Sequence, residues 1–376
     1  MIPFPGMFYW RNKMRSIPLF ILVSLSVTVI GVVATLTGSI LASIYSADVR
    51  PFKHFTLLIS KDLMISESVM ASLEHNPAIR CTVPFLDSSI RAAGLFGSER
   101  RRVYALASED IDFVLDILDL HLVAGRLPRP GSAEVVLHES IMKSRCLKIG
   151  SLVGQEIDKT DYLWGLFEVS GILSGPVPIG VASLEYFKQQ WMFDLGDNAY
   201  ALMAFPQNDV QTMNQTLHAG ADERIIVRDF AYAFESYKTE SRDMDFLLWI
   251  LNIAIISIIS LSMGMLNTIH FLTRMKEYGI LSLIGLNLRT LLRRTLMEVL
   301  ILSLLGFAGG IAISWVLTWV ISTQIFAPRG IRVEIFSLRY MIFTVPIPIF
   351  LALFSFLTIR WNIKKLDVIA IIESRD

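Results

Sequence analysis

Four long uncharged runs of hydrophobic residues divide the chain. Each is long enough for a helix that crosses a bilayer, which takes roughly 20 mostly apolar residues. Between the first and second runs lie about 200 residues of mixed composition, enough for a domain of their own. The pattern therefore predicts four transmembrane helices and one large domain inserted between the first two. The runs cover Ser16–Ala47, Phe246–Leu272, Val299–Ala327 and Tyr340–Ile359.

The first run is longer than a bilayer requires. As a helix it would reach about 48 Å, whereas the hydrocarbon core is roughly 30 Å thick. Basic residues at Arg11, Lys13 and Arg15 would also suit a signal peptide. However, the apolar part of a signal peptide has roughly 7–15 residues, and Tyr45 stands where cleavage requires a small side chain. We therefore expect a retained span whose last turns continue beyond the bilayer as a stalk.

Basic residues near the ends of the runs predict the orientation, because cytoplasmic loops carry an excess of Lys and Arg. The N-terminus, the 274–294 segment and the C-terminal tail lie on one side of a four-span chain and carry twelve of them. The opposite 328–339 connection carries three. Both termini are therefore expected in the cytoplasm and the large domain outside it. The twelve are Arg11, Lys13, Arg15, Arg274, Lys276, Arg289, Arg293, Arg294, Arg360, Lys364, Lys365 and Arg375.

The inserted segment alternates between strand and helix patterns, which predicts a mixed α+β fold. Its length favours two subdomains. The predicted domains are residues 1–47 (N-terminus, first span and stalk), 48–245 (the extracytoplasmic domain) and 246–376 (three spans, the segment between the second and third, and the tail). Strands are expected within 54–60, 100–108, 166–173, 198–205 and 223–229, helices within 66–76 and 208–220, and a strand–helix–strand unit within 125–157.

Composition supports a membrane protein. The chain is 53% hydrophobic and only 18% charged, against about 25% charged residues in soluble domains. Its zero net charge gives no indication of nucleic-acid binding. Cys81 and Cys146 are too few for a disulfide framework. One bridge stays open if both lie outside the cytoplasm, but two small unpaired core residues are the favoured interpretation.

Motifs for catalysis, metal binding and nucleotide binding are missing from the sequence. There is no G-x-S-x-G, no H-E-x-x-H and no G-x-x-x-x-G-K-[ST]. The "HES" at 138–140 fits a helix start better than a hydrolase site. No charged residue lies deep in any apolar run, which argues against an ion-coupled carrier. We expect no catalytic residue, metal or cofactor in this chain. The histidines, scattered without metal-ligand spacing, are His54, His75, His121, His138, His218 and His270.

Small residues recur four apart in two of the runs. Ala34, Gly38 and Ala42 lie in the first, and Gly306 and Gly310 form a G-x-x-x-G in the third. Such spacing lets helix backbones approach closely in lipid. The pattern predicts a tight helix interface, within the chain or with a second permease subunit. The alternative is the ordinary abundance of glycine in membrane helices.

Two other features interrupt the apolar runs. Pro346 and Pro348 should kink the fourth span or unwind its outer part, since each lacks a backbone donor. The 274–294 segment is too charged for lipid, yet its apolar residues follow helical spacing. This predicts a short amphipathic helix on the membrane surface with its other face toward a soluble partner, or else an interfacial loop without a partner. Its apolar positions are Ile280, Leu281, Ile284 and Leu288.

The same segment resembles a known family. "R-x-K-E-Y-G-I-L-x-L-I-G", a basic patch, a glutamate and a glycine-rich third span are similar to the FtsX-like permease domain of MacB-type ABC transporters. Leu281, Ser282 and Leu283 stand where the family often has Leu-Arg-Ala, so the family's arginine is missing here. The matching residues are Arg274, Glu277, Gly279, Ile280, Gly285, Glu298, Gly306 and Gly310.

The resemblance extends over the whole chain. "GRLPRPGSAEVVL", "LKIGSLVG" and "FEVSGIL" are similar to blocks of the family's outer domain. The tail "KKLDVIAIIESRD" is similar to the family's ending, with Val368 in place of its proline.

The resemblance implies an ABC permease that works as a homo- or heterodimer with two copies of a separate ATPase, which binds the ATP and Mg. It implies a bacterial inner membrane, and the partners could include a periplasmic adaptor or a lipoprotein. The segment after the second span would be the coupling helix that rests on the ATPase, and Glu298 would begin the third span. The expected coupling residues are Arg274, Lys276, Glu277, Tyr278, Gly279, Leu288 and Arg289.

Three functions fit these observations. The first is a permease that passes ATP-driven movement to its outer domain and exports or extracts a hydrophobic or amphipathic substrate, such as a peptide, lipid, lipoprotein, antibiotic or haem. The second is an FtsX-type regulator of cell-wall hydrolases that transports nothing, although that class usually has a smaller outer domain. The third is an unpartnered sensor or structural membrane protein. The first is favoured.

Overall fold

The computed structural model separates into two compact units. We call residues 1–38, 243–321 and 334–376 the helical unit, and residues 39–242 and 322–333 the sheet unit. The structure describes residues 13–61, 65, 67–94, 97–190, 201–220, 224–273, 288–331, 333 and 341–364.

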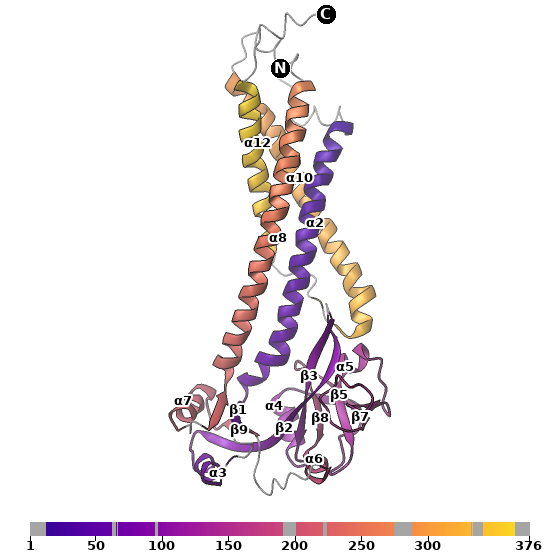
Figure 1. The fold of residues 1–376 in the computed structure, drawn as a ribbon, viewed down its shortest axis with the longest axis vertical. Helices are drawn as coiled ribbons and strands as arrows, with labels where there is room; N and C mark the ends of the chain where they lie inside the picture. Colours follow the sequence, from indigo (N-terminus) through magenta and orange to yellow (C-terminus); the bar gives the residue numbers. More distant parts are fainter. Residues whose placement is uncertain are drawn as a thin grey trace, which may run out of the picture. The chain divides into compact units, whose positions relative to one another are not determined.

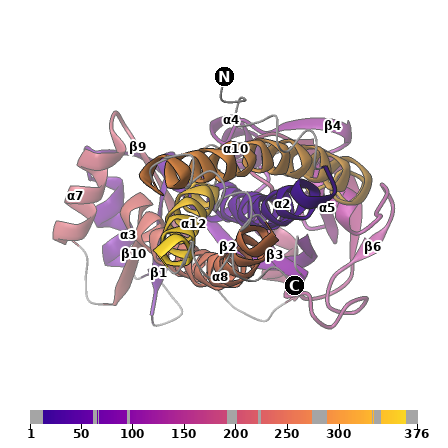
Figure 2. The same cartoon turned by 90° about the horizontal axis from the view of Figure 1, so that it is seen from above.

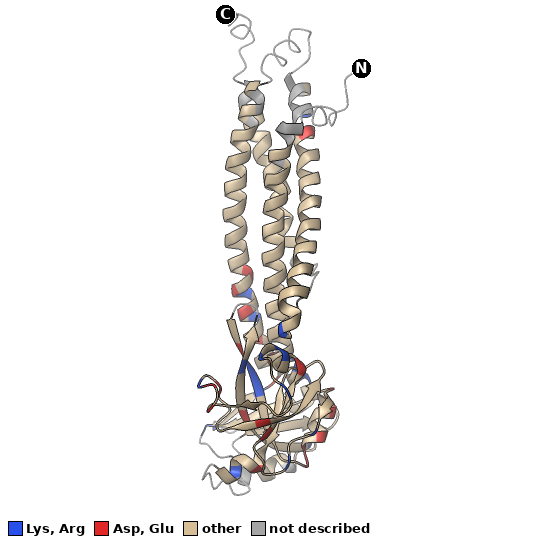
Figure 3. Ribbon diagram, turned by 90° about the vertical axis from the view of Figure 1, so that its right-hand side faces the viewer, with Lys and Arg blue, Asp and Glu red and all other residues tan. Residues whose placement is uncertain are grey.

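Four helices in the described part of the chain are long and apolar enough to cross a membrane, which confirms the four predicted spans. Figure 1 shows them as long coiled ribbons, and Figure 2 shows them gathered into a bundle. Their apolar lengths are almost free of charge, whereas charged residues are frequent in the sheet unit (Figure 3). The helices are α2 (Lys13–Ile44), α8 (Phe230–Thr273), α10 (Leu288–Ile321) and α12 (Pro346–Lys364).

The first two of these helices are longer than a span. A π-helical turn, Tyr45–Val49, and a 3₁₀ turn, Arg50–Lys53, follow α2 without a break. Helix α8 begins at Phe230, well before the apolar run expected from Phe246. Residues 39–44 of α2 and 230–242 of α8 belong to the sheet unit, so both helices have residues in the two units.

The prolines of the fourth span lie at the start of its helix. A 3₁₀ turn, Ile342–Thr344, precedes α12, whose first residue is Pro346. Proline is well tolerated in the first helical turn, because the backbone donors there have no partner within the helix. The expected unwinding is therefore confined to the turn before α12.

The sheet unit contains a mixed sheet of ten strands among the described residues. Its order is β10-β1-β9-β2-β3-β8-β5-β7-β4, and β6 also pairs with β7. The pairs β3–β8 and β5–β7 are parallel, and the others are antiparallel. The strands are β1 (Thr56–Ser60), β2 (Ile79–Gly94), β3 (Gly97–Leu106), β4 (His121–Gly125), β5 (Glu134–His138), β6 (Leu152–Val153), β7 (Phe167–Ser174), β8 (Gly180–Ser183), β9 (Ala201–Pro206) and β10 (Ile225–Arg228).

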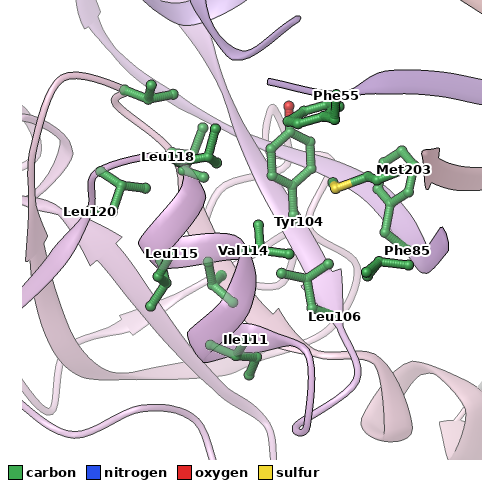
Figure 4. Close-up of a cluster of buried hydrophobic side chains, with 14 of the residues drawn as sticks. Phe55, Phe85, Tyr104, Leu106, Ile111, Val114, Leu115, Leu118, Leu120 and Met203 are labelled. Atoms are coloured by element: carbon green, nitrogen blue, oxygen red, sulfur yellow. The ribbon is translucent and has the colours of Figure 1, made fainter. Parts of the chain in front are cut away.

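Short helices cover this sheet and bury both of its faces. On β3, Tyr104 and Leu106 belong to one core cluster, shown in Figure 4, and Val103 and Ala105 belong to another. Alternate residues of a strand point to opposite faces, so β3 is buried on both sides. The two subdomains expected from the sequence would share this one sheet. The helices are α3 (Glu67–Glu74), α4 (Ile111–Ile117), α5 (Glu139–Ser144), α6 (Leu184–Gln190) and α7 (Val210–Gly220).

The sheet unit also includes residues 322–333, which the sequence placed with the spans. A 3₁₀ turn, Ala327–Arg329, follows the end of α10 and packs against α5. Gly330 has φ +72°, and a Cβ there would lie 2.5 Å from the Ser140 carbonyl oxygen. This close approach joins the connection between the third and fourth spans to the sheet unit.

Candidate functional site

The expected ATPase-coupling residues fall mostly outside the described part of the chain. Arg274, Lys276, Glu277, Tyr278 and Gly279 are among the residues that the structure does not describe. Leu288 and Arg289 are the first two residues of α10, and their side chains are not among those that the structure describes. Glu298, expected at the start of the third span, lies ten residues into that helix with a buried side chain.

The glycines of α10 lie against α2 inside the helical unit. A Cβ on Gly306 would lie 2.9 Å from the Val23 Cβ, and one on Gly310 would lie 2.6 Å from the Val27 Cβ. Real Cβ atoms do not approach so closely, so these positions have no room for a side chain. The Thr28 hydroxyl adds a hydrogen bond across the interface, donating to the Gly310 carbonyl at 3.1 Å.

The small residues expected to pack on α2 lie at different depths. Ala34 and Gly38 are buried, and Ala42 is half-buried in the sheet unit. The close approach falls on Gly31, where a Cβ would lie 2.5 Å from the Ser314 Oγ of α10. Sequence reasoning missed Gly31, although it lies four residues after Val27 on the same helix face.

A polar contact links α8 to the turn before α12. The Asn252 side chain is fully buried, and its amide donates to the Phe343 carbonyl oxygen at 2.5 Å. The Trp249 ring, on the same helix, meets the Phe343 ring edge-on with centroids 5.5 Å apart. Together these contacts hold the 3₁₀ turn beside α8.

The part of α8 in the sheet unit carries an aromatic stripe. Phe230 stacks on Phe234 at 5.6 Å, and Phe234 packs against Tyr237 at 6.1 Å. Tyr237 meets Tyr45 edge-on at 5.4 Å. Lys53 lies over the Tyr45 and Phe230 rings at 5.7 and 5.9 Å. Aromatic contacts therefore join the turns that follow α2 to the first turns of α8; we call these two regions the stalk.

Polar contacts fasten the end of α2 to the β2–β3 hairpin. The Ser43 hydroxyl donates to Glu99 at 3.2 Å and accepts from Arg101 at 2.9 Å. Five residues further along the chain, Asp48 forms an ion pair with Arg102 at 3.4 Å. The hairpin is therefore contacted both by the last turn of α2 and by the π-helical turn that follows it.

Arg102 completes a three-residue cluster at this place. Its guanidinium lies between Asp48 and Asp87, with the Asp87 contact at 3.5 Å. Burial raises the pKa of Asp87, and the nearby Arg102 charge only partly offsets this. The arginine thus lies between a carboxylate of the stalk and a carboxylate of β2.

These contacts surround a cavity of about 560 Å³ within the sheet unit, which we call the junction cavity. The Arg100 guanidinium forms part of its wall, 4.4 Å from the Tyr162 ring centroid and hydrogen-bonded to the Tyr162 hydroxyl at 3.0 Å. The cavity is lined by Ile44, Ala47, Asp48, Asp87, Ser88, Ser89, Glu99, Arg100, Arg101, Arg102, Tyr162 and Glu240.

Other candidate chemistry has structural roles. His138 caps the start of α5, where its Nδ1 accepts the Ser140 backbone N–H at 3.1 Å, which confirms the helix start at "HES". Cys81 and Cys146 are both free thiols, so the structure has no bridge between them. Cys81 is half-buried and Cys146 is exposed, so the expectation that both lie in the core is wrong. Among the described residues, no three His, Cys, Asp or Glu side chains gather as metal ligands.

Comparison with known proteins finds a family match for the part of the chain that contains the second, third and fourth spans. Residues 249–368 match the family described as FtsX-like permease C-terminal. This segment is an FtsX-like permease domain. It takes in the apolar parts of α8, α10 and α12, together with the 274–287 segment between the second and third spans. The match agrees with the resemblance given by the sequence motifs there.

Two solved structures are similar to the chain. The periplasmic region of MacB from Actinobacillus actinomycetemcomitans is 14% identical, with a TM-score of 0.32, and the match covers 51% of this chain and 96% of that one. The extracellular domain of the noncanonic ABC-type transporter YknZ from Gram-positive bacteria is 12% identical, with a TM-score of 0.30, and covers 47% and 99%. No curated protein matches the chain.

Proposed function

We propose that this chain is the permease subunit of an ABC transporter that passes ATP-driven movement to its sheet unit. The observation that carries the proposal is the course of α8. This one unbroken helix runs from the FtsX-like permease domain into the sheet unit. A continuous helix is stiff, so a shift at its permease end would move its sheet-unit end as well.

The energy must come from another chain in this proposal. The sequence has no P-loop, so a separate ATPase, in two copies, would bind ATP and Mg. The 274–294 segment would rest on this ATPase, with Glu277 and Gly279 among the coupling residues. Both termini would be cytoplasmic and the sheet unit extracytoplasmic, in a bacterial inner membrane. A second permease subunit, identical or related, would complete the transporter.

The contacts around the junction cavity would pass the movement on to the sheet. Ser43 and Asp48, at the end of α2, are bonded to β3 through Arg101 and Arg102. Residues 230–242 of α8 reach the same end of α2 through Tyr237. Movement of either helix would therefore reach the long β2–β3 hairpin directly.

The substrate that best fits this arrangement is hydrophobic or amphipathic, taken up from the outer leaflet or the outer side. No charged residue lies deep in the four apolar runs, so they offer no relay for ions. The alternative is an FtsX-type regulator of cell-wall hydrolases without transport. The size of the sheet unit favours transport.

The coupling can be tested with Glu277→Lys and Gly279→Pro, made in the full chain and purified with its ATPase from the native membrane. We expect both variants to insert normally and to lose the permease-dependent part of ATP hydrolysis. Glu156→Lys is the matched control, because it reverses the charge of an exposed residue in the sheet unit. Unchanged hydrolysis in the Glu277 and Gly279 variants would disprove the assignment.

Transport and regulation are separated by a second measurement. In liposomes, a transporter should hydrolyse ATP faster when its lipophilic substrate is present. A regulator should respond to a wall hydrolase and to no lipophilic compound.

A further inference from the structure

An apolar groove of about 300 Å³ runs between α10 and α12. Met297 and Leu300 line it from α10, and Ala352 and Phe356 line it from α12. Met297 and Leu300 are 48% and 40% exposed, so the groove opens on the outside of the helical unit. In a membrane this surface faces lipid chains, which fill such a groove without losing hydrogen bonds.

The groove has positive charge at one end. Arg293 lines it, and as the residue four before Met297 it lies on the same helix face. Arg360 follows Phe356 by four and Ala352 by eight, so it continues the groove face of α12. Helix α10 begins and α12 ends at the same end of the bundle (Figure 1). The two arginines therefore flank the same end of the groove.

Neither arginine has an acidic partner among the residues that the structure describes. Both are exposed, and no described residue forms an ion pair with either guanidinium. A guanidinium presents a planar set of donors that matches two phosphate oxygens at once. Basic positions between transmembrane helices, beside an apolar surface, suit anionic lipid headgroups.

We infer that this groove is a binding site for an anionic glycerophospholipid. Its acyl chain lies along Met297, Leu300 and Phe356, and its phosphate contacts Arg293 and Arg360. A zwitterionic lipid would fill the groove equally well, but its own cation would oppose the two arginines. A soluble phosphate compound would meet the arginines and gain nothing from the groove. The site is independent of the cargo and of the ATPase.

The test is lipid binding to the full-length chain, measured by native mass spectrometry after delipidation. The probes are phosphatidylglycerol and phosphatidylcholine with the same acyl chains. We expect the wild type to prefer phosphatidylglycerol. Arg293→Gln should reduce that preference about fivefold and Arg293→Gln with Arg360→Gln about thirtyfold, since each basic residue near lipid contributes one such factor. Arg329→Gln, an exposed arginine beyond the other end of α10, should leave it unchanged.

Two further measurements separate the groove from the charges. Leu300→Trp should fill the groove and weaken both lipids alike, so that the preference remains. Free glycerol phosphate should not displace phosphatidylglycerol from the wild type. The inference is overturned if the double arginine variant keeps the wild-type preference, or if free glycerol phosphate competes as well as the lipid. Neither result depends on ATP hydrolysis, so the proposed function is tested separately.

Discussion

At the scale of single residues, Gly310 decides how closely α10 approaches α2. A Cβ there would lie 2.6 Å from the Val27 Cβ and 2.7 Å from the Ser24 carbonyl oxygen. The carbonyl belongs to the helix backbone and cannot rotate away. Even one methyl group would therefore force the two helices apart and lose van der Waals contact along the interface.

Gly310→Ala should accordingly destabilise the helical unit by about 1–3 kcal/mol, the usual effect of overpacking. Gly264→Ala is the matched control, because its Cβ would have no neighbour nearer than 3.7 Å. Thermal unfolding of the full chain in detergent measures both. Equal midpoints for the two variants would show that the helices do not pack through Gly310.

Glu134 links the stability of the sheet unit to pH. Two hydrogen bonds from Arg126 lower its pKa to about 2. A carboxylate with a lowered folded-state pKa stabilises the fold above its unfolded value of about 4.5, and this contribution is lost as pH falls toward 2. Because Arg126 is half-exposed, solvent screening reduces the contribution to about 1 kcal/mol.

Between pH 6 and pH 3 the wild type should therefore lose about 1 kcal/mol more stability than Glu134→Gln. Amide exchange of β5 and β7 in the full chain reports this difference, because Glu134 begins β5. Parallel pH profiles for the two proteins would contradict the assignment.

At the scale of helices and strands, one hydrogen bond positions the turn before α12. Asn252→Ala would leave the Phe343 carbonyl without the Asn252 donor in an apolar surrounding. We expect about 1 kcal/mol of destabilisation, the usual net contribution of one hydrogen bond. The matched control is Ser257→Ala, since the exposed Ser257 hydroxyl bonds only to its own helix. Urea or thermal unfolding of the two variants should differ by that amount.

The stalk shows what sequence patterns could and could not supply for these elements. Length alone predicted that the first span continues beyond the bilayer. The charged start of α8 was missed because the prediction followed hydropathy. Its signal was present in Phe230, Phe234 and Tyr237, whose spacings of four and three place three aromatic rings on one helix face. Their partner Tyr45 lies far away in sequence, so the contact itself required the structure.

At the scale of the whole molecule, the number of spans followed from the four uncharged runs because lipid excludes unpaired backbone and charge. The α+β character of the insertion followed from alternating patterns. The strand order did not, since a neighbour such as β9 beside β2 depends on contacts between residues far apart in sequence. The role of Arg102 could not be predicted either, because Asp48 and Asp87 lie next to it only in the folded sheet unit.

The central claim is that movement of the permease domain reaches the sheet unit through its stalk helices. It predicts that the β2–β3 hairpin responds when the ATPase is trapped with nucleotide. Arg102→Gln should remove that response and leave ATP hydrolysis intact, because the arginine transmits movement and does not contact the ATPase. Arg129→Gln, at an exposed position elsewhere in the sheet unit, is the control.

The most direct test is hydrogen exchange of the hairpin in the complex purified from its native membrane, with and without ATP and vanadate. The account predicts a nucleotide-dependent change in exchange over residues 79–94 and 97–106 that is present in the wild type and Arg129→Gln and lost in Arg102→Gln. Identical exchange in the trapped and nucleotide-free wild-type complex would contradict it.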